Sequence, residues 1–329
     1  MKKLLTIVIP VYKVEPYINK CLDSCLVYKT DEDGNRELDE DLMNQLEVII
    51  VNDGTPDHSA EMSREYVKRY PYTFRQIDKE NGGHGSAWNS GLKEATGKYL
   101  RFLDSDDWLT NLEMLMRKLE SIDVDVVVTE MNTFDEQSGV VTKSSLAQTY
   151  NQVMDIEAQE FGGNMSNFWC ATYKTSLLKP LYPLFLEGVS YDDSILYIVP
   201  HLCANSYVAY DFVVYNYLVG REGQSMSVVT QTKKIPDKFK NYQYLHDFAL
   251  NKSGRIDAYV DEVLAHERWT LFNVISFVPN YQESAAYMKK LLLLGSLDHI
   301  NTKKFRRYKL LPFRLFHYLE NVKYRKHSD

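Results

Sequence analysis

Strand-like and helix-like segments alternate through the first 130 residues of this chain, and this pattern limits the fold more than any other feature. The strand-like segments are short, mostly apolar runs at Leu4–Val11, Leu46–Val51, Tyr99–Leu103 and Val124–Thr129, with a weaker one at Thr73–Ile77. Short runs of this kind are typical of strands buried on both faces of a parallel sheet. The alternation therefore predicts an α/β fold with a mostly parallel, Rossmann-like sheet flanked by helices.

Helical spacing separates these runs and dominates the C-terminal part of the chain. The helix-like segments between the strands are Glu15–Val27, Ser59–Tyr70, Ser86–Ala95 and Leu112–Leu119. Residues 131–230 are irregular and rich in aromatic side chains, and the pattern is helical from Lys233 onward. A chain of 329 residues is long enough for about two domains. We therefore expect an α/β domain at 1–230 and a helical domain at 231–329.

Composition excludes several classes of protein. A formal net charge of −7 argues against a general nucleic-acid-binding protein. The four cysteines form no C-x-x-C pair, which favours a reducing compartment such as the cytosol. Because no apolar run approaches about 18 residues and Pro10 interrupts the first one, we expect a strand there and neither a membrane span nor a signal peptide. Residues 29–45 carry seven acidic and two basic side chains, which predicts a solvated insertion.

Three aspartates, Asp104, Asp106 and Asp107, follow the strand-like run Tyr99–Leu103. Burying such a cluster without a counter-charge costs several kcal/mol per charge. A divalent cation removes that cost, and hard oxygen ligands favour Mg²⁺ or Mn²⁺ over zinc. Alternatively, an aspartate caps the helix that follows Trp108, a position for which Asp107 is best placed. Asp104 and Asp106 would then still be able to hold an ion that keeps open positions for substrate phosphates.

A further acidic residue, Asp53, follows the run Leu46–Val51. Ligands of parallel sheets bind beyond the carboxyl ends of the strands, so we expect Asp53 and Asp104 to face the same crevice. The pair Asp53-Gly54 also fits a tight turn, although the helix-like segment that follows excludes a hairpin. A buried carboxylate at Asp53 could instead accept the N–H of a nucleobase.

Two other segments carry side chains suited to this crevice. The glycine-rich loop 81–86 opens a helix but is neither a P-loop nor a G-x-G-x-x-G motif, so a backbone bend and a ligand loop both remain open. His84 in this loop is expected to be solvated or packed and not a metal ligand. Asp192 and Asp193 precede an apolar run, where acidic residues favour the first turn of a helix. Opposite a metal-bound diphosphate, one of them could act as a general base.

The segment 303–329 differs from the rest of the chain in its charge. It holds nine Lys and Arg residues against two acids, interleaved with aromatic side chains. It fits a solvated helical surface of the C-terminal domain. It also fits a peripheral contact in which residues 303–327 dock on an anionic membrane and bring the protein to a lipid-linked substrate.

In combination, these segments resemble the family 2 glycosyltransferases of the GT-A fold. The matching motifs occur in order at Ile7–Tyr12, Val51–Asp57, Asn81–Gly83, Asn89–Leu92, Gly97–Tyr99, Leu103–Asp107, Tyr191–Asp193, Tyr215–Tyr217 and Gln224–Ser227. The resemblance covers about residues 4–230, and no comparable motif follows.

The resemblance implies an inverting transferase that uses a nucleotide-diphosphate sugar and Mn²⁺ or Mg²⁺. The donor-binding residues that it implies are Pro10, Tyr12, Asp53, Gly82, Gly83, Asp104 and Ser105, with Asp53 on the nucleobase. Asp106 corresponds to the principal metal ligand, with Asp104 beside it. Asp193 corresponds to the catalytic base and Asp192 to a residue that supports it.

The expected reaction is transfer of a hexose or amino sugar, from a UDP-sugar, to a glycan or lipid-linked acceptor in surface polysaccharide synthesis. We expect the protein in the cytoplasm, with a possible contact on the inner face of the membrane. Two residues depart from the family pattern. Trp88 replaces the arginine of the usual Ala-Arg-Asn motif, and Asp192 stands where Glu is commoner. The main alternative is a non-catalytic nucleotide-sugar or glycan-binding module, which would need no base at Asp193.

Overall fold

The computed structural model describes most of the chain. The described residues are 2–30, 35–144, 149–155, 168–221, 228–251, 259–295, 297 and 303–328. The chain divides into two compact units, Met1–Glu222 and Gly223–Asp329. The sequence pattern led us to expect the division after residue 230, where helical spacing becomes continuous.

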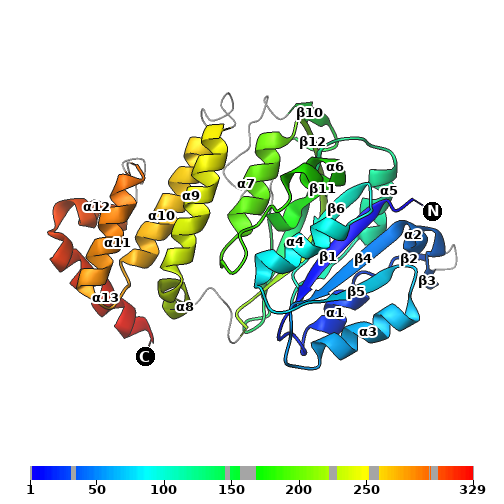
Figure 1. Ribbon diagram of the computed structural model, residues 1–329, viewed down its shortest axis with the longest axis horizontal. Coiled ribbons are helices and arrows are strands. Elements are labelled where there is room, and N and C mark those ends of the chain that lie inside the picture. Colours follow the sequence, from blue (N-terminus) through cyan, green and yellow to red (C-terminus); the bar gives the residue numbers. More distant parts are fainter. Residues whose placement is uncertain are drawn as a thin grey trace. The chain divides into compact units, whose positions relative to one another are not determined.

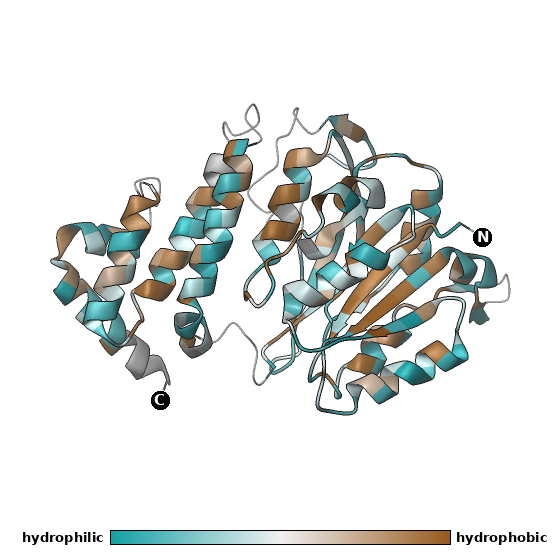
Figure 2. Ribbon diagram, viewed as in Figure 1, coloured by the Kyte–Doolittle hydropathy of each residue, from teal (hydrophilic) through white to brown (hydrophobic). Residues whose placement is uncertain are grey.

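Parallel strands form the centre of the first unit. Strand β1 (Leu5–Val11) lies between β4 (Leu46–Asn52) and β6 (Tyr99–Phe102) and runs parallel to both (Figure 1). Strand β5 (Phe74–Asp78) adds in parallel beyond β4. Every residue of β1, β4 and β6 is buried, as their continuous apolar composition predicts, and Figure 2 shows these strands as mostly hydrophobic. Their carboxyl ends lie at one edge of the sheet, so Asp53 after β4 and Asp104 after β6 lie at the same edge, as predicted; that they face one crevice stays a prediction.

The other half of the sheet is mixed. Strand β11 (Ala171–Lys174) pairs antiparallel with β6 and with β8 (Val126–Asp135), and β12 (Ser206–Val219) runs parallel to β8. Two register shifts interrupt β12 between Tyr210 and Tyr215, and the exposed Asp211 lies within that irregular stretch. These irregularities explain why residues 131–230 carry no clean strand pattern. The sheet is completed by the short strands β7 (Trp108–Leu109), β9 (Val141–Lys143) and β10 (Val153–Asp155).

Helices flank this sheet, which confirms the predicted fold class. They are α1 (Ile18–Asp23), α3 (Ser59–Arg69), α4 (His84–Glu94), α5 (Leu112–Glu120), α6 (Thr175–Leu178) and α7 (Asp193–Cys203). The acid-rich insertion forms a hairpin, β2 (Tyr28–Thr30) with β3 (Arg36–Leu38), and then helix α2 (Glu40–Gln45). It is not wholly solvated: Asp39 is buried, caps α2 by accepting the Leu42 N–H, and pairs with Arg117. The prediction that residues 29–45 are solvated is therefore wrong for the C-terminal end of this segment, where the buried Asp39 stabilises the start of α2.

The second unit is helical in its described part, as predicted. Its helices are α8 (Val228–Lys233), α9 (Ile235–Asn251), α10 (Tyr259–Ile275), α11 (Tyr281–Leu293), α12 (Lys303–Leu310) and α13 (Phe313–Ser328). Phe272 of α10 contacts the rings of Phe305, Tyr308 and Phe316. Part of the aromatic pattern of the basic segment therefore serves to pack helices α12 and α13 on α10. Within the described part of the chain, no helix is long and apolar enough to cross a membrane.

Helix α4 approaches the sheet closely at Gly91. A Cβ atom added there would lie 2.1 Å from Val8 Cγ1 in β1, which is fully buried. In an exposed helix, Gly→Ala is stabilising by about 1 kcal/mol. Here we expect Gly91→Ala to reduce the free energy of unfolding by about 1–3 kcal/mol, because Val8 is β-branched and cannot yield. Urea denaturation measures this change in the free energy of unfolding. The control is Lys93→Ala at an exposed position of the same helix, whose free energy of unfolding should stay within about 0.5 kcal/mol of the parent. An unchanged or more stable Gly91→Ala protein would contradict the predicted close packing.

Candidate active site

A glycine-rich loop encloses the Asp53 carboxylate just beyond β4. Asp53 is 3% exposed, and it accepts hydrogen bonds from the backbone N–H groups of Gly82 and Gly83, each at 2.9 Å. Lys79 Nζ lies 2.7 Å from Asp53 Oδ1. Gly83 has a φ of +85°, a conformation that favours glycine, and this turn aims the two N–H groups at the carboxylate. Asp53 therefore holds the backbone just before α4. The glycine-rich loop bends the chain there and surrounds the Asp53 carboxylate.

The end of β1 lies beside Asp53. The Asp53 N–H donates to the Val11 carbonyl at 3.1 Å, and the Lys13 N–H donates to Thr55 Oγ1 at 2.8 Å. Pro10 is buried in β1, whereas Tyr12 is 43% exposed just past the strand. Residues 10–13 and Asp53 thus lie side by side at the carboxyl edge of the sheet, where the nucleotide-sugar donor is predicted to bind. Contact of Asp53 with a nucleobase remains a prediction.

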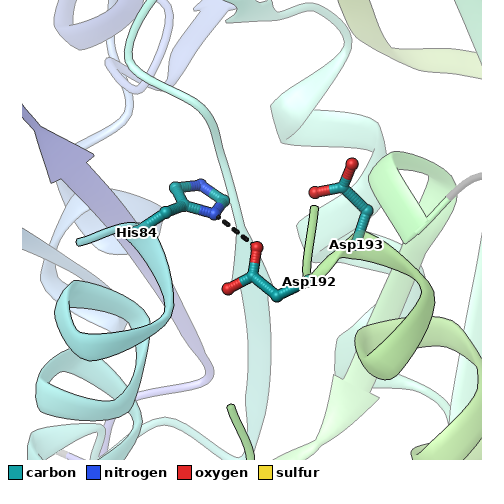
Figure 3. A group of neighbouring side chains, drawn as sticks. All are labelled: His84, Asp192 and Asp193. Atoms are coloured by element: carbon teal, nitrogen blue, oxygen red, sulfur yellow. Dashed lines mark hydrogen bonds and ion pairs between the residues drawn. The ribbon is translucent and has the colours of Figure 1, made fainter. Parts of the chain in front are cut away.

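His84 joins two acidic segments that are far apart in the sequence. Its Nε2 atom lies 3.0 Å from Oδ1 of Asp104, which follows β6, and its Nδ1 atom lies 3.1 Å from Oδ1 of Asp192, which precedes α7. Figure 3 shows His84 at the start of α4, with the Asp192 carboxylate turned toward its ring. Burial alone would lower the pKa of His84, but Asp192 and Asp104 outweigh burial and raise it well above its usual value. Each ring nitrogen therefore lies at hydrogen-bond distance from a carboxylate oxygen, and the ring joins the two acidic segments.

A buried aromatic group supports the His84 ring. Its centroid lies 3.8 Å from that of Trp88, one turn further along α4. Trp88 is fully buried and packs on Phe102 and Phe185 at centroid distances of 5.0 and 4.9 Å. The tryptophan that replaces the usual arginine thus belongs to the packing beneath the site.

Asp106 pairs with a cation that the sequence analysis did not identify. Its Oδ2 atom lies 2.5 Å from Nε of Arg221, just past β12. Burial, followed by the charge of Asp104, raises the pKa of Asp106, and Arg221 only partly opposes this rise. Two carboxylates that repel each other, on alternate residues of one loop, fit a hard divalent cation. The predicted metal pair therefore has a suitable donor set, with Ser105 buried between its members.

Asp107 does not cap a helix, so that alternative is wrong. Its Oδ1 atom accepts the Leu218 N–H at 2.7 Å, and its Oδ2 atom accepts the Tyr215 hydroxyl at 2.6 Å. Strand β7 intervenes before α5, whose N-cap is Asn111. Burial, Asp106 and Asp104 together raise the pKa of Asp107 well above its usual value. Asp107 therefore holds the segment Asp104–Asp107, the acidic loop, against β12.

Two aromatic residues complete the wall of the site. Trp169, in the short helix η2 (Phe168–Cys170), donates from Nε1 to Asp104 Oδ2 at 3.2 Å and stacks on Tyr217 with ring centroids 4.6 Å apart. Burial, followed by Asp107, Asp104, Asp193 and Asp106, raises the pKa of the Tyr217 hydroxyl. Tyr217 thus lies within electrostatic range of every aspartate of the acidic loop and of Asp193.

Asp192 and Asp193 differ in exposure. Asp192 is 1% exposed, whereas Asp193, the first residue of α7, is partly exposed. Within the described residues, His84, Asp192 and Asp193 form a group whose potential ligand atoms lie within 4.8 Å of one another. Both ring nitrogens of His84 already face carboxylates, whereas Asp104 and Asp106 offer the oxygen ligands that Mg²⁺ and Mn²⁺ prefer, so this pair suits such a cation better.

The sequence analysis missed His84, Arg221, Lys79 and Trp169 as members of the site. His84 and Lys79 precede or begin a helix at the carboxyl edge of the parallel strands, and this position was a usable signal. Arg221 and Trp169 come from segments whose path depends on the antiparallel half of the sheet. No local pattern could have placed them.

Comparison with known proteins agrees with this geometry. Residues 6–180, more than half of the chain, match the family "Glycosyl transferase family 2". Glycosyltransferase GlyA from Streptococcus pneumoniae is 30% identical over 191 residues, which are 54% of this chain and 25% of GlyA. The poly(ribitol-phosphate) beta-N-acetylglucosaminyltransferase TarS from Staphylococcus aureus is 25% identical over 264 residues, which are 79% of this chain and 43% of TarS. The chain thus spans less than half the length of these two curated relatives.

A solved structure is similar in fold. The structure of TarS residues 1–349 with UDP-GlcNAc matches with a TM-score of 0.69 at 19% identity, over 98% of this chain and 92% of that one. The mixed sheet, the motifs at its carboxyl edge and the match over residues 6–180 lead to one conclusion. This chain belongs to glycosyl transferase family 2.

Proposed function

We propose that this chain is an inverting glycosyltransferase that moves a sugar from a nucleotide-diphosphate donor to a hydroxyl group. The observation that supports this proposal most is the His84 bridge. It brings the pair Asp192–Asp193 to the same place as Asp104 of the acidic loop. The residue proposed as general base thus follows Asp192, which His84 links to Asp104, and the Gly83 N–H just before His84 donates to Asp53.

In the proposed reaction, the partly exposed Asp193 accepts the proton of the acceptor hydroxyl. The acceptor oxygen forms a bond to the anomeric carbon from the face opposite the leaving group. The bond between that carbon and the diphosphate oxygen breaks, and the nucleoside diphosphate leaves with the electron pair. A single displacement of this kind inverts the anomeric centre. Asp192 supports Asp193 from the buried side of the α7 start.

The family implies Mn²⁺ or Mg²⁺, and the donor set at Asp104 and Asp106 suits either ion. Bound there, the cation would supply positive charge for the departing diphosphate. Pro10, Tyr12, Asp53, Gly82, Gly83 and Ser105 would border the nucleotide. Arg221 and His84 partly balance the charge of the acidic loop in the chain itself.

For the donor we propose a UDP-sugar, and for the acceptor a surface glycan or a lipid-linked glycan. TarS supports this choice, since its structure contains UDP-GlcNAc and its name gives a β-linked product on poly(ribitol phosphate). The sugar of UDP-GlcNAc is α-linked, so a β product corresponds to inversion. A hexose or an amino sugar would fit the proposal equally.

A screen of nucleotide-sugar hydrolysis tests this function. The purified chain is incubated with Mn²⁺ and UDP-, GDP- or dTDP-sugars, and release of the nucleoside diphosphate is measured. We expect turnover with at least one UDP-sugar, and an inverted anomeric configuration in the initial product by NMR. The absence of turnover, together with tight UDP binding by calorimetry, would instead favour the non-catalytic nucleotide-sugar module. Retention of the configuration would contradict the direct displacement.

We also propose that the basic segment 303–327 contacts the inner face of the membrane. Leu310 and Tyr318 are 81% and 63% exposed, and Arg306, Lys309 and Arg314 are exposed near them in the sequence. Apolar and cationic side chains together suit an anionic lipid surface, at about 1 kcal/mol per cation. In flotation with vesicles rich in phosphatidylserine, whose negative surface potential attracts cationic side chains, we expect the full chain to float. We expect the variant with Lys309 and Arg314 changed to Glu to stay at the bottom.

Neutral phosphatidylcholine vesicles are the control for this experiment. Equal flotation of the parent and the Glu variant would leave the segment as a solvated helical surface. The aromatic residues Phe305 and Phe316 are left unchanged because they are buried in the second unit.

A further inference from the structure

His84 links the acid that supports the proposed base to the acid beside the proposed donor, and this link suggests a role of its own. We propose that His84 is a positioning residue that holds Asp192, and with it the first turn of α7, in register with Asp104. The inference rests on the proposed function. In this role, the His84 side chain sets the distance between Asp193, the proposed base, and the leaving diphosphate of the donor.

Asp192 depends on His84 for its side-chain hydrogen bond. The carboxylate is 1% exposed, and His84 is its only side-chain partner within the described residues. Its second oxygen, Oδ2, is buried and has no hydrogen-bond partner in the same part of the chain. A buried carboxylate without a counter-charge is strongly unfavourable. Removal of the His84 ring would therefore leave both oxygens of the buried Asp192 without a side-chain partner and favour its turning out of the site.

The α4 side of Asp192 is closely packed. A Cβ atom added at Gly85 would lie 2.6 Å from Asp192 Oδ2, so the carboxylate lies directly against the α4 backbone. The ring of His84, which contacts the other carboxylate oxygen, is itself packed on Trp88 at a centroid distance of 3.8 Å. Asp192 is thus held between the glycine and the His84 ring.

The α7 start follows Asp192. Asp192 is the N-cap residue, its side chain makes no capping bond, and its carbonyl accepts the Ile195 N–H at 3.0 Å. The Asp192 side chain therefore contacts α4 and does not cap α7, while the Asp192 carbonyl accepts the first hydrogen bond of α7. Asp193 is the next residue, so a displaced Asp192 would move the proposed base.

Two amide substitutions separate the two halves of the bridge. In His84→Asn, the amide nitrogen takes the place of Nδ1 and can still donate to Asp192. In His84→Gln, it takes the place of Nε2 and can still donate to Asp104. The exposed His58→Gln is the control, because its side chain is 78% exposed.

We measure kcat and KM for hydrolysis of the UDP-sugar that the wild-type protein turns over fastest, with Mn²⁺. We expect His84→Gln to lower kcat at least tenfold while KM changes less than threefold. In His84→Asn, kcat should stay within about fivefold of the parent, and KM for the donor should rise, because the Asp104 contact is lost. Equal effects of the two substitutions, or parent values in both, would overturn the assignment.

Hydrogen exchange provides a readout that does not need turnover. Peptides that cover residues 189–197 should exchange at least threefold faster in His84→Gln than in the parent and in His84→Asn. If the parent itself hydrolyses no nucleotide sugar, the proposed function fails, and the exchange pattern still tests the bridge. If the parent is active and the exchange of residues 189–197 is unchanged in His84→Gln, the positioning role fails alone.

Discussion

Asp106→Ala is expected to abolish metal-dependent sugar transfer. The substitution removes one of the two carboxylates proposed to hold the cation and leaves Asp104, which is already bonded to His84 and Trp169. Metal ions contribute several kcal/mol to stabilising the charge of the transition state. The expected decrease in kcat/KM is therefore about 10³-fold or more, since each tenfold step corresponds to about 1.4 kcal/mol. Rates measured over a range of Mn²⁺ concentrations provide the test.

The control for this experiment must separate the metal from the ion pair. Arg221→Gln breaks the same contact with Asp106 but keeps both carboxylates. It should therefore retain a rate that depends on Mn²⁺. If Asp106→Ala kept its dependence on Mn²⁺ with an unchanged half-saturating concentration, Asp106 would not be a metal ligand. Circular dichroism of both variants confirms that the first unit is folded.

Asp193→Asn is expected to decrease kcat by about 10²–10⁴-fold, the usual contribution of a general base. The amide has the same size as the carboxylate but cannot accept the acceptor proton at neutral pH. Because Asp193 is separate from the proposed donor contacts at Asp53 and Asp104, KM for the nucleotide sugar should change less than threefold. Steady-state kinetics with saturating acceptor, or with water as the acceptor, measures both parameters.

Glu187→Gln is a matched control for Asp193→Asn. It removes one carboxylate charge from an exposed position in the same segment, six residues before the proposed base. We expect parent kinetics from it. A parallel loss of UDP affinity and of kcat in Asp193→Asn would assign this residue to donor binding and not to proton transfer.

The sequence predicted the parallel half of the sheet well, for a physical reason. Strands β1, β4 and β6 are buried on both faces, so their apolar composition is continuous and marks them clearly. Strand β12 could not be recognised in the same way. Its buried runs are separated by an exposed or partly exposed stretch at 211–213, it shifts register twice, and its Tyr215 and Tyr217 contact Asp107 and Trp169.

The candidate site was predictable where one segment supplies the chemistry. The aspartates at 104 and 106 stand two residues apart, and the acid pair at 192 and 193 precedes an apolar run that forms α7. Contacts between segments were not predictable. His84 was expected to be solvated or packed because nothing local shows that two carboxylates, 20 and 108 residues away, meet at its ring.

Trp88 has a consequence for attempts to redesign this protein toward the common Ala-Arg-Asn pattern. A guanidinium at position 88 would replace a ring enclosed by Phe102 and Phe185 and would lie next to the His84 ring, whose pKa the neighbouring carboxylates raise. A one-step reversion to arginine should therefore yield a poorly folded protein, and a successful exchange requires positions 84 and 88 to change together. Among natural homologues, the two positions are then expected to covary, with histidine accompanying an apolar partner and not arginine.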